Sequence, residues 1–190
     1  SGQIPESIGN LSNLTSMYIS NNDLSGEMPS SIGNLINLYY IELYGNQLSG
    51  SIPSSIGNLG MLEHLFLWNN NLIGEIPSSI GNLTNLSRLD LYGNEISGYV
   101  PSEIGNLLNL ATLKLNSNNI QYLPEEICEL ENLNWSVNND WWDSNIYNNQ
   151  ICPPYPDCLS EEDIGYQDTS DCEPILGDLN DDGILNILDI

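Results

Sequence analysis

The residues best suited to chemistry lie near the end of the chain, in a stretch where oxygen-bearing side chains recur at fixed intervals. Such side chains fall at positions 1, 3, 5, 9 and 12 of a loop that starts at Asp178, with Gly183 at position 6 and a backbone carbonyl at position 7. The predicted ligands are Asp178, Asn180, Asp182, Ile184 through its carbonyl, Asn186 and Asp189. This spacing predicts a weak Ca²⁺ site rather than a merely solvated acidic loop, because Gly183 and Leu185 are in register as well.

Four cysteines are the second group with chemical meaning: Cys128, Cys152, Cys158 and Cys172. An even number of cysteines in a segment with little core of its own predicts disulfides and an oxidising compartment. Three pairings are possible, and we favour Cys128 with Cys152 and Cys158 with Cys172. Zinc is disfavoured because closely spaced cysteine pairs are absent from the sequence.

Catalysis has little support in the sequence. His64 and Asp90 are expected on neighbouring strands, but we expect no serine or cysteine nucleophile beside them and no carboxylate pair at hydrolase spacing. The sequence therefore predicts that the protein is not an enzyme.

The element that must position these residues is a repeat. Isoleucines followed by Gly-Asn-Leu recur every 24 residues from Ile8 to Ile104, and a last step of 23 residues reaches Ile127. A fixed period of this size predicts a solenoid.

Within one repeat, Leu65 and Leu67 alternate with outward residues, which predicts one short strand per turn and a parallel sheet of stacked strands. Asparagines that recur at the following bend are interpreted as structural, and recurring glycines as turn positions. They are Asn22, Asn46, Asn70, Asn94, Asn118 and Gly26, Gly50, Gly74, Gly98.

The repeat matches the pattern L-x-x-L-x-x-L-x-L-x-x-N-x-L, and a phrase such as Leu48–Pro53, Leu-Ser-Gly-Ser-Ile-Pro, follows it. Residues 1–134 resemble the plant-specific class of leucine-rich repeats, seen in receptor-kinase ectodomains and polygalacturonase-inhibiting proteins. The resemblance implies an α/β-type solenoid, a right-handed superhelix with a parallel concave β-sheet and short 3-10 or helical convex turns. Ser1–Pro5 aligns with Ser25–Pro29, so we expect the chain to open within a repeat.

The phrase Gly-Asp-Leu-Asn-Asp-Asp-Gly at 177–183 resembles the first calcium loop of a bacterial dockerin domain. Dockerins carry two such loops and dock onto cohesin modules, so the resemblance implies a bacterial protein and a possible cohesin partner. We therefore predict a solenoid at 1–134, a disulfide-bonded C-terminal cap and acidic linker at 135–174, and a truncated dockerin-like calcium loop at 175–190. Trp135, Trp141 and Trp142 are expected to form a lid over the last turn.

The outward positions of the strands form three columns on the concave face, and these columns gather residue types that are rare elsewhere in the chain. Both cations, the one histidine and the one phenylalanine fall there. The predicted ligand-binding residues are Tyr18, Tyr40, Glu42, Tyr44, His64, Phe66, Trp68, Arg88, Asp90, Tyr92 and Lys114. Outward aromatic rings indicate either a binding surface or packing between neighbouring strands.

Charge limits the partners. The chain has 2 cations and 26 acidic residues, a net charge of −24, and the sequence contains no transmembrane run. Such an acidic protein would be repelled by nucleic acid, and membrane insertion is not expected. The sequence therefore predicts a secreted or cell-surface protein that binds a protein, peptide or polysaccharide on its concave face, with a calcium-dependent attachment module at its C-terminus. The alternative is an extracellular scaffold or adhesive spacer without a specific ligand on that face.

Overall fold

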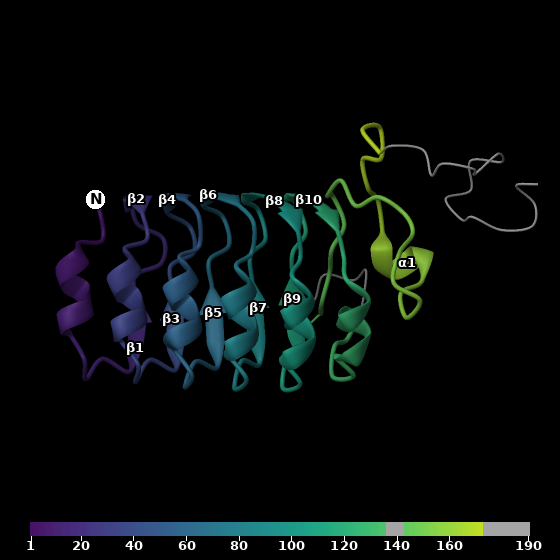
Figure 1. The fold of residues 1–190 in the computed structure, drawn as a ribbon. Coiled ribbons are helices and arrows are strands. Elements are labelled where there is room, and N and C mark those ends of the chain that lie inside the picture. The colour runs from purple at the N-terminus through teal and green to yellow at the C-terminus, as the bar shows by residue number, and fades with distance from the viewer. Residues whose placement is uncertain (136–142, 173–190) are drawn as a thin grey trace, which may run out of the picture.

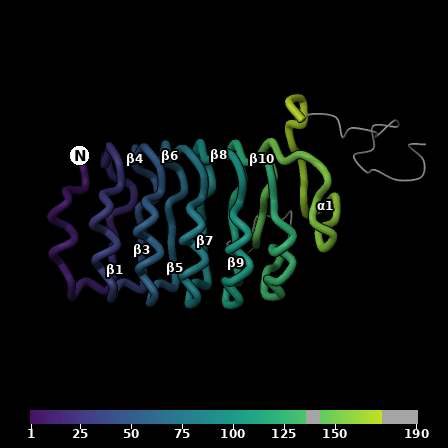
Figure 2. Tube along the Cα trace, in the orientation of Figure 1, coloured from purple at the N-terminus to yellow at the C-terminus, as the bar shows by residue number. Residues whose placement is uncertain are grey.

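A computed structural model describes residues 1–135 and 143–172. Over these residues the chain winds as a row of similar coils, and successive coils lie side by side from one end of the molecule to the other (Figures 1 and 2). Each of the regular coils contributes one strand to each of two sheets and one 3-10 helix. The solenoid predicted from the period of the sequence is confirmed.

The first sheet, which we call the concave sheet, has the strand order β1-β3-β5-β7-β9, and all its strands are parallel. Its strands are β1 (Ser16–Tyr18), β3 (Tyr40–Glu42), β5 (His64–Phe66), β7 (Arg88–Asp90) and β9 (Thr112–Lys114). Leu65 pairs with Ile41 on one side and Leu89 on the other, and all three side chains are fully buried. The inward column thus forms the core, as the alternation of the sequence predicts.

A second sheet lies along another side of the coils and was not predicted. Its parallel strands are β2 (Ser25–Glu27), β4 (Gln47–Gly50), β6 (Asn71–Gly74), β8 (Glu95–Tyr99) and β10 (Asn119–Tyr122). Gly50 has a φ of 70°, and a Cβ there would lie 2.7 Å from the Cγ of Glu27 in the preceding coil. A glycine at this position therefore allows both a positive φ and a close approach to the preceding coil, as predicted.

Short 3-10 helices complete the coils. They are η1 (Glu6–Asn10), η2 (Ser30–Asn34), η3 (Ser54–Asn58), η4 (Ser78–Asn82), η5 (Ser102–Asn106) and η6 (Glu125–Glu129). A proline precedes each of them, which suits a helix start because proline has a fixed φ and no N–H to leave unpaired. Gly57 sits so near the Ser79 carbonyl of the next coil that a Cβ would clash with it. The repeated Gly-Asn-Leu phrase thus sets how closely these helices stack.

Four of the five recurring asparagines form a ladder of buried amides, whereas Asn22 is exposed and donates only to carbonyls of its own coil. The amide nitrogen of Asn46 donates to the carbonyls of Leu43, 2.9 Å away, and of Ile19, 3.0 Å away, and its oxygen accepts from the Leu24 N–H at 3.0 Å. The same arrangement recurs at Asn70, Asn94 and Asn118. Each amide satisfies backbone groups of two coils at once, which confirms the structural interpretation.

This ladder continues past residue 134, where the sequence predicts the regular solenoid to end. Asn149 donates to the Leu115 and Ile146 carbonyls at 3.0 and 2.8 Å and accepts from the Ile120 N–H at 3.0 Å. Gln167 then occupies the next rung, donating to Ile146 and Ile164 carbonyls at 3.1 and 2.8 Å. The C-terminal cap is thus built partly as shortened coils that keep the amide ladder. A short helix, α1 (Glu161–Ile164), precedes the last rung.

Two disulfides hold the cap, and their pairing differs from the one we favoured. Cys128 is bonded to Cys158 and Cys152 to Cys172. Cys152 donates its N–H to the Gln121 carbonyl, which places it beside β10, whereas Cys128 lies in η6 on a different side of the coil. The favoured pairing of Cys128 with Cys152 is therefore wrong because the two residues face different neighbours.

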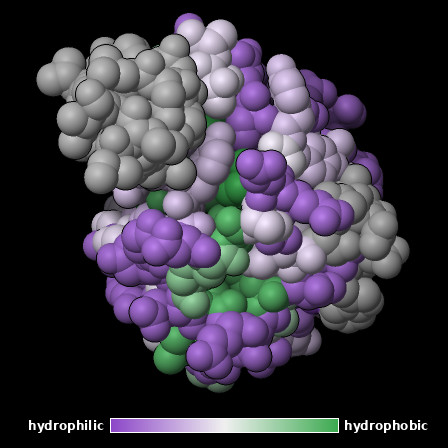
Figure 3. Space-filling model, turned by 90° about the vertical axis from the view of Figure 1, so that its right-hand side faces the viewer, coloured by the Kyte–Doolittle hydropathy of each residue, from purple (hydrophilic) through white to green (hydrophobic). Residues whose placement is uncertain are grey.

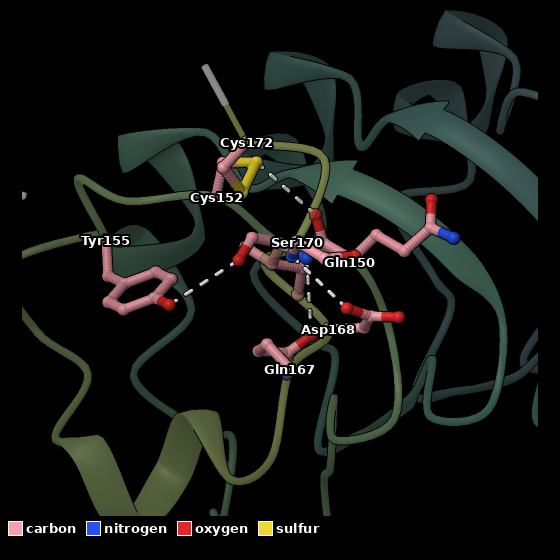
Figure 4. Close-up of a disulfide and its surroundings, with 8 residues drawn as sticks. Gln150, Cys152, Tyr155, Gln167, Asp168, Ser170 and Cys172 are labelled. Carbon is pink, nitrogen blue, oxygen red and sulfur yellow. Dashed lines mark hydrogen bonds between the residues drawn. A yellow bond between two sulfur atoms is a disulfide. The ribbon is translucent and has the colours of Figure 1, made fainter. Parts of the chain in front are cut away.

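The Cys152 bridge lies within the hydrogen-bonded part of the cap (Figure 4). The hydroxyl of Tyr155 donates to the Ile151 carbonyl at 3.4 Å, and the Ser170 N–H donates to Asp168 at 3.2 Å. Figure 3, which shows the right-hand side of Figure 1, shows hydrophobic residues in a strip between hydrophilic ones. Trp135 packs against the core, as the predicted lid requires, while Trp141 and Trp142 lie outside the described residues. Along the described residues, no helix has the length and apolar content needed to cross a membrane.

Candidate binding face

The concave sheet brings the predicted ligand-binding residues together. In the first column, Tyr40 pairs with His64, and His64 pairs with Arg88. In the second column the neighbours are Tyr18, Glu42, Phe66, Asp90 and Lys114. The third column, Tyr44, Trp68 and Tyr92, lies two residues after the end of each strand. The backbone carbonyls of these residues accept hydrogen bonds from the preceding coils. Their placement on one face is confirmed, whereas their binding of a ligand stays a prediction.

The third column contains an aromatic stack. The rings of Tyr44 and Trp68 are parallel to within 7°, with centroids 4.1 Å apart. Tyr92, on the following coil, is 37% exposed. The indole N–H of Trp68 is buried and has no hydrogen-bond acceptor among the described residues. The stack is therefore a stiff, half-buried aromatic surface with one unsatisfied donor.

The first two columns hold a second aromatic cluster that is more closely packed. Tyr40 lies at the centre of this cluster, with ring centroids 5.0 Å from Tyr18, 5.0 Å from His64 and 5.6 Å from Phe66. Phe66 is only 4% exposed, although its position points out of the sheet. Arg88 and Asp90 are also buried. Packing between neighbouring strands, the alternative to a binding surface, therefore describes this cluster well.

Burial shifts the ionisation of several groups on this face. Desolvation, aided by a 3.0 Å hydrogen bond from its hydroxyl to Glu42, raises the pKa of Tyr40 to about 12. Desolvation also raises the pKa of Asp90 to about 6, against the opposing effects of a hydrogen bond from the Tyr92 N–H and the charge of Lys114. The pKa of His64 is lowered, first by burial and then by Arg88. Neutral His64 is therefore the form this face favours.

One feature of the face contradicts the sequence-based view of catalysis. The hydroxyl of Ser87 lies 3.4 Å from Nδ1 of His64, so a serine does stand beside the histidine. That hydroxyl also donates to the Glu63 carbonyl at 3.1 Å, and the His64 ring is stacked on Phe66. A catalytic triad needs a group that orients the histidine toward the nucleophile, and a ring stack does not supply one. Among residues 1–135 and 143–172 there is also no group of three side chains suited to hold a metal ion.

Sequence reasoning missed the last rung of the concave face. Asn145 forms a parallel bridge with Lys114, and the Ser117 N–H donates to the Tyr147 carbonyl at 3.0 Å. The face thus extends one coil beyond β9. The signal was present in Ile146-Tyr-Asn-Asn149, which keeps the Leu-x-x-Asn spacing after an interruption. The predicted calcium ligands, from Asp178 to Asp189, lie outside the described residues.

Comparison with known sequences identifies the repeats. Residues 13–35 and 37–59 each match the model of the Leucine Rich Repeat, and residues 61–101 match the model of two copies of Leucine Rich repeats. No curated protein sequence matches the chain.

Solved structures that resemble the chain include two Arabidopsis receptor kinases. One is the leucine-rich-repeat ectodomain of GASSHO1/SCHENGEN3 from Arabidopsis thaliana in complex with CASPARIAN STRIP INTEGRITY FACTOR 2, at 38% identity and a TM-score of 0.73, covering 79% of this chain and 17% of that one. The other is Arabidopsis HAESA in complex with the peptide hormone IDA and the co-receptor SERK1, at 36% identity and a TM-score of 0.73, covering 82% and 25%. The chain thus spans a quarter or less of the length of these receptor structures.

A bacterial structure is similar as well. The Leptospira interrogans leucine-rich-repeat protein LIC12759 shares 33% identity with the chain at a TM-score of 0.67, and the match covers 82% of this chain and 36% of that protein.

Proposed function

We propose that this chain, a leucine-rich-repeat solenoid closed by a disulfide-bonded cap, is a non-enzymatic recognition module that binds an extended segment of another protein along its concave sheet. The premise is structural: the repeats place side chains from successive coils in straight columns about 4.8 Å apart. An extended chain that lies across such columns meets an equivalent position at every coil.

The observation that carries the proposal is the third column. Tyr44 and Trp68 are stacked without being fully buried, and Tyr92 continues the column toward the solvent. Large aromatic side chains dominate binding energy at protein interfaces because they bury much area at little cost in side-chain entropy. The buried Trp68 N–H adds a donor that a ligand carbonyl would satisfy after a small rearrangement.

The comparisons support a protein or peptide partner. The HAESA structure is described as a complex with a peptide hormone, and the GASSHO1/SCHENGEN3 structure as a complex with an integrity factor. Polysaccharide is the second ligand class, since flat aromatic rings beside polar groups also suit a sugar ring. Two disulfides support a secreted or cell-surface location, because such bonds persist in oxidising surroundings.

The test is a screen of peptide and glycan arrays followed by calorimetry of the hits. We expect Trp68→Ala to weaken binding by about 2 kcal/mol or more, roughly thirtyfold. Tyr99→Ala is the matched control, because Tyr99 is an exposed aromatic residue on the second sheet. Hits that survive a double change of Trp68→Ala and Tyr92→Ala would refute binding at this column.

The second candidate function is a spacer that holds other modules apart. The close packing of Tyr40 against Phe66 and Tyr18 favours it, because Phe66 is buried by its neighbours and needs no ligand, although Tyr18 stays 59% exposed. A screen without hits in either ligand class would support the spacer.

For the C-terminal stretch we propose a calcium-dependent attachment module of the bacterial dockerin type, with a cohesin as partner. The support is the spacing of Asp178, Asn180, Asp182, Asn186 and Asp189, with Ile184 contributing its carbonyl. We expect Ca²⁺ to bind weakly, on the order of 10⁻⁴ to 10⁻³ M. Calorimetry with Asp178→Ala and Asp182→Ala together tests the site, and equal heats from both proteins would exclude it.

A further inference from the structure

An exposed apolar patch lies outside the columns of the concave sheet. It belongs to the loops at the bottom of Figure 1, each of which leads from a 3-10 helix into a concave strand. Ile36 and Met61 are each 58% exposed, and Tyr39 is 42% exposed. These three residues come from two neighbouring coils, and we call them the rim patch.

The rim patch interrupts a polar ladder. Elsewhere along this rim, an asparagine amide donates to the carbonyl of the preceding coil, as from Asn37 to Ser12 at 2.8 Å and from Asn85 to Gly60 at 2.6 Å. The same bond recurs farther along the rim, from Asn109 to Thr84 and from Asn132 to Leu108. Met61 occupies the position of these asparagines in its own coil, and the residue of the preceding coil that corresponds to Ser12 and Gly60 is Ile36. An apolar side chain thus replaces a bonded amide beside a second exposed apolar residue, so the local structure alone does not account for it.

Few charged residues surround the patch. Between Met28 and Leu62 the chain contains a single one, Glu42. The exposed Glu63 borders the patch on the next coil, where its N–H donates to the Tyr39 carbonyl at 2.9 Å. Leu108 provides the contrast. It is 61% exposed, but its carbonyl accepts a hydrogen bond from the Asn132 amide, and it lies beside Glu129 and Glu131. The buried centres of protein interfaces lack charged residues and are rich in aromatic residues and methionine. The rim patch has that composition, and Leu108 does not.

We infer that the rim patch is a docking surface for a different protein, which contributes an apolar segment that is uncharged or basic. The net charge of −24 argues for this occupant, because a second copy of the chain would bring the same charge and be repelled. The patch is also continuous with the concave face, since the Tyr39 ring lies edge-on to Tyr40 with centroids 6.4 Å apart. A partner seated on the rim patch can therefore extend toward the aromatic cluster without reaching the stack of Tyr44 and Trp68.

The chain supplies its own replacement residues for a test. The coil two steps beyond Ile36 and Tyr39 has Thr84 and Ser87 at the equivalent positions, and the coil after Met61 has Asn85. The triple change Ile36→Thr, Tyr39→Ser and Met61→Asn therefore removes the patch with residues that the fold already accepts. The probe is a random peptide library displayed on phage and selected on the wild-type protein. We expect peptides rich in aromatic and aliphatic residues and poor in acidic ones, whose affinity falls at least tenfold in the triple variant.

Control variants and a measurement of oligomeric state separate the possible outcomes. Trp68→Ala and Leu108→Thr should leave the affinity of these peptides unchanged, and a loss in Trp68→Ala equal to that in the triple variant would place the peptides on the concave columns and overturn the inference. If the triple variant melts at a lower temperature than the wild type, Met61→Asn alone replaces it, because the amide regains a bond to the neighbouring carbonyl. A wild-type dimer in sedimentation velocity that the variant abolishes would show that the occupant is a second copy and overturn the assignment. Selection that yields no peptide discriminating the wild type from the variant would overturn it as well.

Discussion

Asn70 and Asp90 are both polar and both nearly buried, yet they stand in different energetic situations. The Asn70 amide donates to three carbonyls and accepts from the Leu48 N–H, so its desolvation is offset by bonds. Asp90 accepts a bond from the Tyr92 N–H and is raised in pKa chiefly because burial disfavours its charged form. At the scale of single residues, the desolvation of Asn70 is thus offset by hydrogen bonds, whereas that of Asp90 is only partly offset and raises its pKa.

This difference predicts a pH dependence for Asp90. Its pKa is about 6 in the folded protein and 3.8 as the ordinary value, so between pH 4 and 6 the folded state binds more protons than the unfolded state. Stability contributed by the protonated form is therefore present below the ordinary pKa and lost as the pH rises through the folded pKa. We expect Asp90→Asn to be more stable than the wild type above pH 6, by about 1 to 3 kcal/mol, and the gap to close toward pH 4. Urea unfolding at several pH values checks this, and a gap that does not change with pH would contradict it.

At the scale of elements, no strand or helix within residues 1–135 and 143–172 is long enough to be stable alone. The concave strands are three residues long and the 3-10 helices five, so the coil is the smallest unit that buries a core, and each coil needs its neighbours. The distances between coils therefore matter more than the propensities within them.

The glycine of the repeated Gly-Asn-Leu phrase offers a direct test of that spacing. Gly57→Ala places a Cβ against the Ser79 carbonyl of the next coil, whereas Gly60→Ala meets no atom within 4 Å. We expect the first change to cost about 1 to 3 kcal/mol through overpacking and the second to be nearly neutral. Chemical denaturation of both variants measures the difference. Equal stabilities would mean that the coils can move apart without loss.

The elements also show what the sequence could and could not predict. Alternation around Leu65 and Leu67 was sufficient to predict the concave sheet and the neighbours in each column. The second sheet was not predicted because a strand such as β4 contains one inward leucine and a glycine, a pattern typical of a turn. For the candidate site, membership of the face was predictable, but the burial of Phe66 was not, since it depends on the rings of Tyr40 and His64 that cover it.

At the scale of the whole molecule, the coils differ in cross-linking. Cys128–Cys158 and Cys152–Cys172 cross-link the coils from η6 onward, whereas the coils before η6 contain no disulfide. In a stack where each coil contacts only its neighbours, stability is set locally, so the cross-linked end should open last.

The disulfides make this testable. The Cys128–Cys158 bridge closes 30 residues of sequence, and its removal by paired Cys→Ser changes should cost about 2 to 4 kcal/mol. Hydrogen exchange should then show faster opening in residues 143–167 than in the coils around Leu65. Free-thiol titration of the unreduced, unfolded protein tests the premise, since four free thiols would mean that neither bridge forms.

The crossed order of these two bridges also decides how a mechanical pull would pass through the protein. Tension applied at Cys172 travels through its disulfide to Cys152, along the short backbone to Cys158, and through the second disulfide to Cys128 in η6. The longer stretch of chain from 129 to 151, which contains Asn149, lies outside this covalent route. A tether attached at that end would therefore pull on the solenoid at its last regular coil, through both disulfides and the segment 152–158, while the rest of the cap would carry no load.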